Sequence, residues 1–132
     1  MGVCKILLVD DDKIILMQAL KELKQTDFEV EAVESAEKAI ERVKQKTFDI
    51  VFTDLVLPGM NGVELCADIK KINPKTEVVL MSGRPHEIEK IQLAFLNVGG
   101  RDESLRKPLM IDELLKVAQK ICKEREAKEN NP

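Results

Sequence analysis

The chain has 132 residues, 44% of them hydrophobic, which is enough for one domain with a single core and excludes a wholly disordered chain. Its net charge is −3 at pH 7 and it contains no Tyr or Trp, so we expect no direct binding of nucleic acid, which needs a basic surface or aromatic platforms. It has no apolar run of membrane-spanning length and no signal-peptide pattern, so we expect a cytoplasmic protein with no membrane partner.

The three cysteines, Cys4, Cys66 and Cys122, are far apart in the sequence, and none belongs to a C-x-x-C pair. An odd number without that spacing is typical of reduced thiols in a cytosolic protein, and not of a disulfide framework or a zinc site. We therefore predict three free thiols, with Cys66 as a small core residue of a helix.

The first predicted strand is the apolar run 3–9, and the acids Asp10, Asp11 and Asp12 follow it directly. Apolar residues at helical spacing predict a helix over 13–24, whose N-terminus favours negative charge. One capping Asp is enough for that purpose, whereas three neighbouring carboxylates repel one another unless a cation compensates. The surplus of acids indicates a cation site.

A nearly continuous apolar run, 48–52, predicts a strand covered on both faces, as in a parallel sheet. Asp54 ends this strand. The segment that follows is predicted to be a tight loop, in which Pro58 fixes φ while Gly59 and Gly62 permit positive φ. Asp54 is thus expected at the carboxyl end of a buried strand, where open α/β sheets bind their ligands, although Asp is also common as a simple turn residue.

The other segments continue an alternation of strands and helices. A half-exposed strand is predicted over 28–33, and Ser35 is the expected N-cap of the helix that follows. The predicted elements are helices over 36–46, 62–72, 85–96 and 111–124, and strands over 76–81 and 103–106. We expect residues 1–123 to form the domain, and the charged residues 124–132 to form a frayed tail or the start of a linker.

Five alternations with short connections predict an α/β fold with a parallel sheet, whose carboxyl strand ends meet at one edge. The side chains expected at this edge are three carboxylates, one hydroxyl and one ammonium, from Asp10, Asp11, Asp54, Ser82 and Lys107. Converging carboxylates suit Mg²⁺, and a lysine and a hydroxyl beside it suit a transferring phosphoryl group. One carboxylate is then the nucleophile that forms an acyl phosphate.

Four motifs carry a resemblance to a known family: I-L-L-V-D-D-D, T-D-L-V-L-P-G-M-N-G, V-V-L-M-S-G and L-R-K-P. Over roughly residues 3–123 the chain resembles the CheY-like receiver domain of response regulators, the phosphoacceptor module of two-component signalling and phosphorelays. The resemblance implies a single-domain, flavodoxin-like (βα)5 three-layer sandwich with a five-stranded parallel sheet of order 2-1-3-4-5. It also implies a protein that catalyses its own phosphorylation and dephosphorylation, not a conventional metabolic enzyme.

The resemblance further implies a role for each residue of the edge. Asp54 is the expected acceptor of a phosphoryl group from a histidine kinase or phosphotransfer protein. Asp11 and Asp54 are expected to bind Mg²⁺ with the backbone carbonyl of Val56, while Asp10 acts mainly through metal-bound water.

Ser82 and Lys107 are each expected to contact a phosphoryl oxygen, and the Lys107–Pro108 bond is expected to be cis. Asp12 is then the structural acid of the triplet, serving the N-terminus of the helix.

One position differs from the family's usual pattern. Ser104 stands where the family usually has Tyr or Phe, whose ring moves inward when the hydroxyl of the preceding strand contacts the phosphate. A serine cannot fill that cavity, so the switch is expected to run through the loop after Ser82 or to be weak.

Val56 and Arg84 flank the expected water path, and an apolar Val56 cannot orient an attacking water, which predicts slow loss of the phosphoryl group.

Two alternatives stay open from the sequence. A pseudo-receiver would keep the fold as an interaction module without phosphotransfer, and Ser104 gives this reading some support. A haloacid-dehalogenase-type phosphatase would use Asp10 of Asp10-x-Asp12 as its nucleophile, but leaves Asp54 without a role. For a receiver, the expected further partners are a downstream target or an output domain, and a second copy bound through the 86–124 face.

Overall fold

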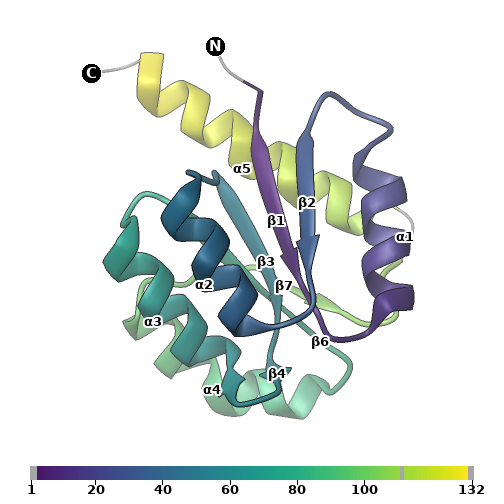
Figure 1. Cartoon of the computed structure of the whole chain (residues 1–132), viewed down its shortest axis with the longest axis vertical. Coiled ribbons are helices and arrows are strands. Elements are labelled where there is room, and N and C mark those ends of the chain that lie inside the picture. The colour runs from purple at the N-terminus through teal and green to yellow at the C-terminus, as the bar shows by residue number, and fades with distance from the viewer. Residues whose placement is uncertain (1–2, 111, 131–132) are drawn as a thin grey trace.

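The computed structural model describes residues 3–110 and 112–130, and a five-stranded parallel sheet lies at its centre (Figure 1). In space the strand order is β2-β1-β3-β6-β7. The five strands are β1 (Lys5–Val9), β2 (Glu29–Val33), β3 (Ile50–Asp54), β6 (Glu77–Ser82) and β7 (Ser104–Arg106). Counted along the chain these are strands one to five of the sheet, so the predicted order 2-1-3-4-5 and the flavodoxin-like fold are confirmed.

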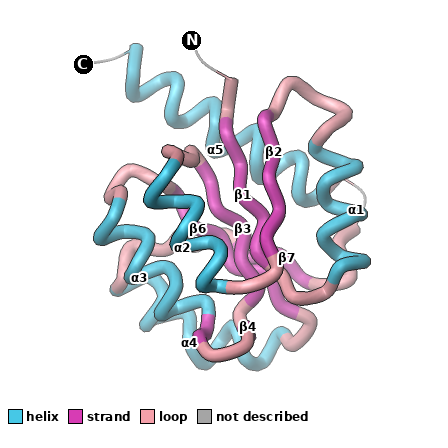
Figure 2. Tube along the Cα trace, viewed as in Figure 1, coloured by secondary structure: helices cyan, strands magenta, loops and turns pink. Residues whose placement is uncertain are grey.

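Helices cover both faces of the sheet and make a three-layer sandwich (Figure 2). On one face lie α1 (Lys13–Leu23) and α5 (Glu113–Asn130). On the other face lie α2 (Ala36–Gln45), α3 (Gly62–Ile72) and α4 (Pro85–Asn97). Among the described residues, no helix is both long enough and apolar enough to cross a membrane.

The strands alternate their side chains between two separate cores. In β3, Val51 faces the core under α2, α3 and α4, while Ile50 and Phe52 face the core under α1 and α5. All three are fully buried. This two-sided burial is the reason that the segment is apolar almost without interruption, as the sequence predicted.

Local capping explains where several helices begin. The Asp12 carboxylate accepts a hydrogen bond from the backbone N–H of Ile14 at 2.9 Å, so its predicted structural role is confirmed. The Ser35 hydroxyl caps α2, also as predicted. Asn61 and Glu64 form a capping box at the start of α3, which fixes the helix that leads away from the loop after Asp54.

The predicted tight loop after Asp54 contains a small antiparallel pair, β4 (Val56–Leu57) and β5 (Met60–Asn61). Gly59 at its turn has φ of 76°, as expected for a glycine there. Gly62 does not use the positive φ that a glycine permits: it begins α3, and crowding of the space beside its Cα explains the glycine.

The prediction of three free thiols is wrong, because Cys4 and Cys122 form a disulfide. Cys4 directly precedes β1 and Cys122 lies in α5, 118 residues further along the chain. Residues of β1 and α5 share the core on one face of the sheet, so the two segments lie close together. The Cα atoms of Cys4 and Cys122 are 6.2 Å apart, a separation that a disulfide can bridge. Cys66 is buried in α3 as a free thiol, as predicted.

The predicted frayed tail is also shorter than expected. The last helix does not end at 124 but continues to Asn130, so the charged residues 125–130 are helical. Apolar periodicity is missing from this end of α5, where Glu124 pairs with Arg101 and Arg125 pairs with Asp49. Residues 131 and 132 of the predicted tail lie outside the described residues.

Candidate functional site

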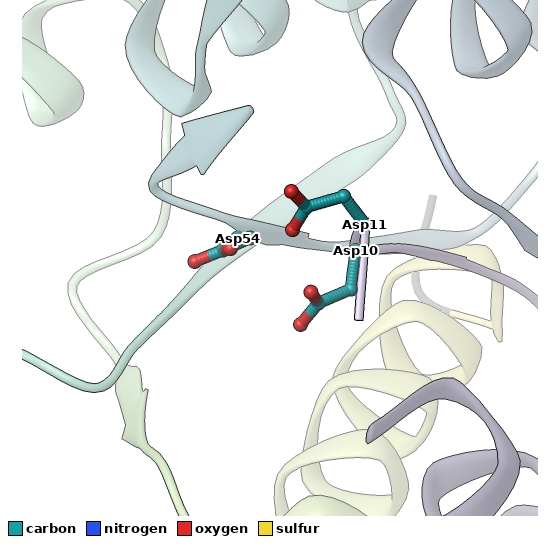
Figure 3. A group of neighbouring side chains, drawn as sticks. All are labelled: Asp10, Asp11 and Asp54. Carbon is teal, nitrogen blue, oxygen red and sulfur yellow. The ribbon is translucent and has the colours of Figure 1, made fainter. Parts of the chain in front are cut away.

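Three carboxylates meet at the carboxyl edge of the sheet (Figure 3). Asp10 and Asp11 follow β1, and Asp54 ends the adjacent strand β3. One oxygen from each of the three lies within 4.8 Å of the others. The side chains differ in exposure: Asp10 is fully buried, Asp54 is 14% exposed and Asp11 is exposed. The predicted convergence of these residues is therefore present.

The donor set fits a hard divalent cation. Its ligand atoms are carboxylate oxygens, and their separations allow one ion to contact all three. The graded exposure matters, because Mg²⁺ keeps several waters and needs an open side, which the exposed Asp11 provides. The backbone N–H of Asp12 donates a 2.9 Å hydrogen bond to the Asp10 carboxylate. This bond holds the Asp10 side chain in place at the centre of the cluster.

Lys107 brings a positive charge into the same cluster. Its ammonium pairs with the carboxylate of Asp10 and, at 3.2 Å, with that of Asp54. The Lys107 N–H also donates to the Ser82 carbonyl at 2.9 Å, which ties the end of β7 to the end of β6. The Lys107–Pro108 peptide bond is cis, as predicted. The lysine is thus held by its backbone on one side and by two carboxylates on the other.

The pKa values of Asp54 and Lys107 are both raised, for different reasons. Burial raises the pKa of Asp54 and the Asp10 charge raises it further, although the Lys107 ammonium opposes both. For Lys107, burial acts to lower the pKa, but the hydrogen bond to Asp10 and the charges of Asp54 and Asp10 outweigh it and the pKa is raised. Lys107 therefore stays charged beside the Asp54 carboxylate.

Ser82 lies one residue beyond the Met81–Asp54 pair of the β6–β3 ladder, so its strand ends beside the acid cluster. The side chain is buried, with 3% exposed. Its hydroxyl accepts a hydrogen bond from the Arg84 N–H at 3.0 Å and lies 3.4 Å from the Arg84 carbonyl. In this structure the hydroxyl therefore organises the loop that leads into α4.

The residues expected to control water and readout lie around this edge. Val56 is 59% exposed on β4, and the Arg84 side chain is turned to solvent in a 3.1 Å pair with Glu87. Ser104 is exposed on the edge strand β7. Beside it lies a hollow of about 390 Å³ between β7 and α5, lined by Ser104, Leu105, Arg106, Glu113, Lys116 and Val117.

Gly62 is a site residue whose role the sequence did not reveal. A Cβ at this position would lie 2.9 Å from the backbone oxygen of Asp54 and 2.7 Å from the Leu80 side chain. The Gly62 N–H donates to the Leu55 carbonyl at 2.7 Å, so the start of α3 is pressed against the segment that carries Asp54. A glycine within a P-G-x-x-G loop is a weak signal, because the same residue also occurs in turns for conformational reasons.

Comparison with known proteins identifies relatives. A family model described as "Response regulator receiver domain" matches residues 6–119. The chain is 30% identical over 111 residues to "Response regulator ArlR" of Staphylococcus saprophyticus, covering 84% of this chain and 49% of the relative. It is 31% identical over 112 residues to "Cell cycle response regulator CtrA" of Brucella ovis, covering 84% and 47%. The chain therefore spans about half the length of these relatives.

Solved structures share the whole fold. A CheY-like response regulator receiver domain protein from Methanospirillum hungatei superposes with a TM-score of 0.84 at 27% identity, covering 96% of this chain and 99% of that one. The chemotaxis response regulator CheY4 of Vibrio cholerae gives a TM-score of 0.80 at 26% identity, covering 91% and 99%. The similarity thus includes all five strand–helix units.

Proposed function

The chain belongs to the family of response regulator receiver domains, and we propose that it accepts a phosphoryl group on Asp54 from the phosphohistidine of a histidine kinase or phosphotransfer protein. The observation that carries this proposal is the meeting of Asp54, two further carboxylates and the Lys107 ammonium at one edge of the sheet. Asp54 is the partly exposed carboxylate that ends a buried strand, which suits a nucleophile that an outside donor must reach.

In the proposed reaction a carboxylate oxygen of Asp54 attacks the phosphorus of the donor. A P–O bond forms, the P–N bond to the imidazole breaks, and the imidazole leaves with the bonding electrons. Lys107 is already paired with the attacking carboxylate, so its ammonium is placed to offset charge on the transferred group. The Ser82 hydroxyl, released from the Arg84 backbone, would donate a hydrogen bond to a phosphoryl oxygen.

The fit of the acid cluster to a divalent cation supports Mg²⁺ as the cofactor, held by Asp11 and Asp54, with the Val56 carbonyl as a further ligand and Asp10 acting mainly through bound water. When bound, this ion would offset the negative charge of the phosphoryl oxygens. The chain's own contribution is to hold three carboxylates and one ammonium close together before the donor arrives. Asp10 is fully buried, so its charge needs the neighbouring cations.

Exposed apolar side chains near the site support docking of another protein there. Ile14, Val56 and Met110 are 67%, 59% and 62% exposed, and each lies within a few residues of a site residue. A downstream target, an output domain or a second copy is proposed for the 86–124 face, where Leu93 of α4 is 71% exposed. A cytoplasmic location remains a proposal, and the cysteines no longer support it.

Phosphatase chemistry at Asp10 is not proposed. The Asp10 side chain is fully buried and its carboxylate pairs with Lys107, so an external phosphate ester cannot reach it as the structure stands. In a pseudo-receiver without phosphotransfer, the acid cluster would have only a structural role. The test below distinguishes this alternative from the proposed function.

The proposal is tested by incubating the protein with acetyl phosphate, with and without Mg²⁺, and measuring intact mass beside the Asp54→Asn variant. We expect one phosphoryl adduct that requires Mg²⁺ and is absent from the variant. Wild-type protein that binds Mg²⁺ but gains no adduct from acetyl phosphate or from a phosphorylated phosphotransfer protein would indicate a pseudo-receiver.

A further inference from the structure

The Cys4–Cys122 disulfide lies far from the acid cluster, at the opposite edge of the sheet. Cys4 directly precedes β1, so it marks the amino edge, whereas Asp10 and Asp11 follow the same strand at its carboxyl edge. The bond joins the beginning of the first strand to the last helix across 118 residues of sequence. It therefore closes nearly the whole described chain into one covalent loop.

The bond occurs where the apolar attachment of α5 ends. The helix is anchored by three buried residues, Leu114, Ala118 and Ile121. After Ile121, the described part of the helix contributes no further fully buried side chain, and residues 126–128 are exposed. The second half of α5, 122–130, thus begins at the disulfide.

The remaining contacts of this segment are polar. Glu124 pairs with Arg101 at 3.0 Å, and Arg125 pairs with Asp49 at 3.2 Å and donates to the Lys75 carbonyl. Ion pairs of this partly exposed kind contribute little on their own, because water and salt screen them. The covalent bond is therefore the strongest restraint on the second half of the helix.

We propose that Cys4 and Cys122 form a thiol–disulfide exchange site whose oxidation state sets how firmly residues 122–130 of α5 are held against the sheet. The oxidant is a low-molecular-weight disulfide such as oxidised glutathione. One cysteine thiolate attacks it and forms a mixed disulfide with release of one small thiol, and the second cysteine then displaces the other. Two protein thiols lose two electrons and two protons, and the small disulfide is reduced to two thiols.

The chain contains its own control thiol. Both cysteines of the pair are partly exposed, as exchange requires, whereas Cys66 is buried and burial raises its thiol pKa to about 11. Its Sγ lies 3.9 Å from the Val98 carbonyl, inside the core between α3 and α4. Cys66 is thus expected to stay reduced under conditions that oxidise the pair.

The first test is a redox titration. The protein is equilibrated in mixtures of reduced and oxidised glutathione, its free thiols are alkylated under denaturing conditions, and the peptides are identified by mass. We expect Cys4 and Cys122 to become protected together in one step while Cys66 is alkylated throughout. The proposal is overturned if the pair stays alkylated in excess oxidised glutathione, or if each cysteine ends as a stable mixed disulfide.

The second test measures hydrogen exchange of the 122–130 amides in the oxidised and reduced protein. Reduction should speed exchange in this segment about tenfold or more, with little change in β3. Cys122→Ser should match reduced wild type in both buffers, and Cys66→Ala should keep the full difference. Should Cys122→Ser fail to fold, the oxidised and reduced wild type still supply the comparison, and equal exchange in both would overturn the proposal.

Phosphorylation at Asp54 provides a separate readout, because the acid cluster lies at the other edge of the sheet. We expect both redox forms to gain the same adduct from acetyl phosphate. The exchange site does not depend on the proposed phosphoacceptor function, and the failure of either can be recognised without the other.

Discussion

Lys107 offsets part of the negative charge of the acid cluster. Lys107 contacts both Asp10, which is fully buried, and Asp54. A buried carboxylate that loses its partner keeps the cost of desolvation without the compensating attraction. Lys107, which we propose assists phosphoryl transfer, is therefore also expected to stabilise the free protein.

Replacing Lys107 with Met should destabilise the protein by about 3 kcal/mol in the absence of divalent cations, because Asp10 and Asp54 then repel each other. Mg²⁺ should recover more stability in this variant than in wild type. The measurement is urea unfolding in EDTA and in Mg²⁺. Lys120→Met, which removes an exposed lysine paired with Glu103, is the matched control and should change little. Equal Mg²⁺ effects in Lys107→Met and wild type would contradict this role.

Val56 is expected to control the lifetime of the phosphoryl adduct. It is exposed on β4 beside the acid cluster, and its side chain cannot orient a water molecule. Val56→Asn should therefore speed loss of the phosphoryl group by roughly tenfold, by positioning an attacking water. The lifetime of the adduct, followed by mass after removal of acetyl phosphate, measures this. Val3→Asn, at a similarly exposed valine before β1, should leave the lifetime unchanged. An unaltered adduct lifetime in Val56→Asn would contradict the prediction.

At the scale of elements, the junction between β3 and α3 places Asp54. Gly62→Ala would put a Cβ 2.9 Å from the Asp54 backbone oxygen, so the start of α3 must move. We expect a loss of about 1–3 kcal/mol in the free energy of unfolding and slower phosphorylation. Gly83→Ala is the control, since its Cβ would meet Lys107 at an ordinary 3.8 Å. Stability and phosphorylation unchanged in Gly62→Ala would show that the junction tolerates the shift.

The pairing of β2 with α2 predicts a dependence on pH. A hydrogen bond from Arg42 lowers the pKa of Glu31 to about 2 against partial burial, with Lys46 assisting. A carboxylate whose folded-state pKa is depressed stabilises the fold above its unfolded pKa, here 4.5, and loses this contribution as the pH falls toward about 2. Glu31→Gln should cost about 1 kcal/mol at pH 7, with screening by water allowed for, and much less at pH 2. Unfolding of both proteins across this pH range measures the difference, and a constant gap would contradict the pairing.

The sequence predicted the five strands and five helices of the main fold because each carries its signal locally. Segment 48–52 is apolar except for Asp49, and Asp12 and Ser35 stand directly before their helices. The same holds for the site, since Asp10, Asp11, Asp54 and Lys107 all follow predicted strands. Right-handed crossovers then bring those strand ends together.

What the sequence could not predict depends on contacts between distant segments. The Cys4–Cys122 bond follows from how α5 packs on the sheet, and no spacing rule reports it. Glu124 and Arg125 of the extended α5 pair with Arg101 and Asp49, which lie far away in the chain. The crowding at Gly62 appears only once Leu80 is placed beside it.

At the scale of the whole molecule, the proposed phosphorylation of Asp54 would need a route to a distant surface. The edge strand β7 has Ser104 in place of an aromatic residue, with a hollow beside it. The inward movement of an aromatic ring, expected from the family resemblance, therefore has no counterpart at this position. The remaining route is the loop after Ser82, whose hydroxyl now bonds with the Arg84 backbone and whose chain leads into α4.

If Ser82 turns to the phosphoryl group, the Arg84 backbone loses a partner and the start of α4 should loosen or shift. We therefore expect hydrogen exchange to change over 84–97 and 104–106 when free and phosphorylated proteins are compared, and to stay the same in β2 at the far side of the sheet. Ser82→Ala should abolish the change over 84–97. Identical exchange in free and phosphorylated wild type would mean that this face does not respond.

The most direct test of the central claim is to locate the phosphoryl group. The protein is phosphorylated with acetyl phosphate and Mg²⁺, the acyl phosphate is reduced with borohydride, and the peptides are mapped by mass. We predict that Asp54 alone is converted to homoserine, because it is the partly exposed carboxylate that pairs with Lys107. Conversion of Asp10, or of neither residue in protein that carries the adduct, would contradict the assignment of Asp54 as the phosphoacceptor.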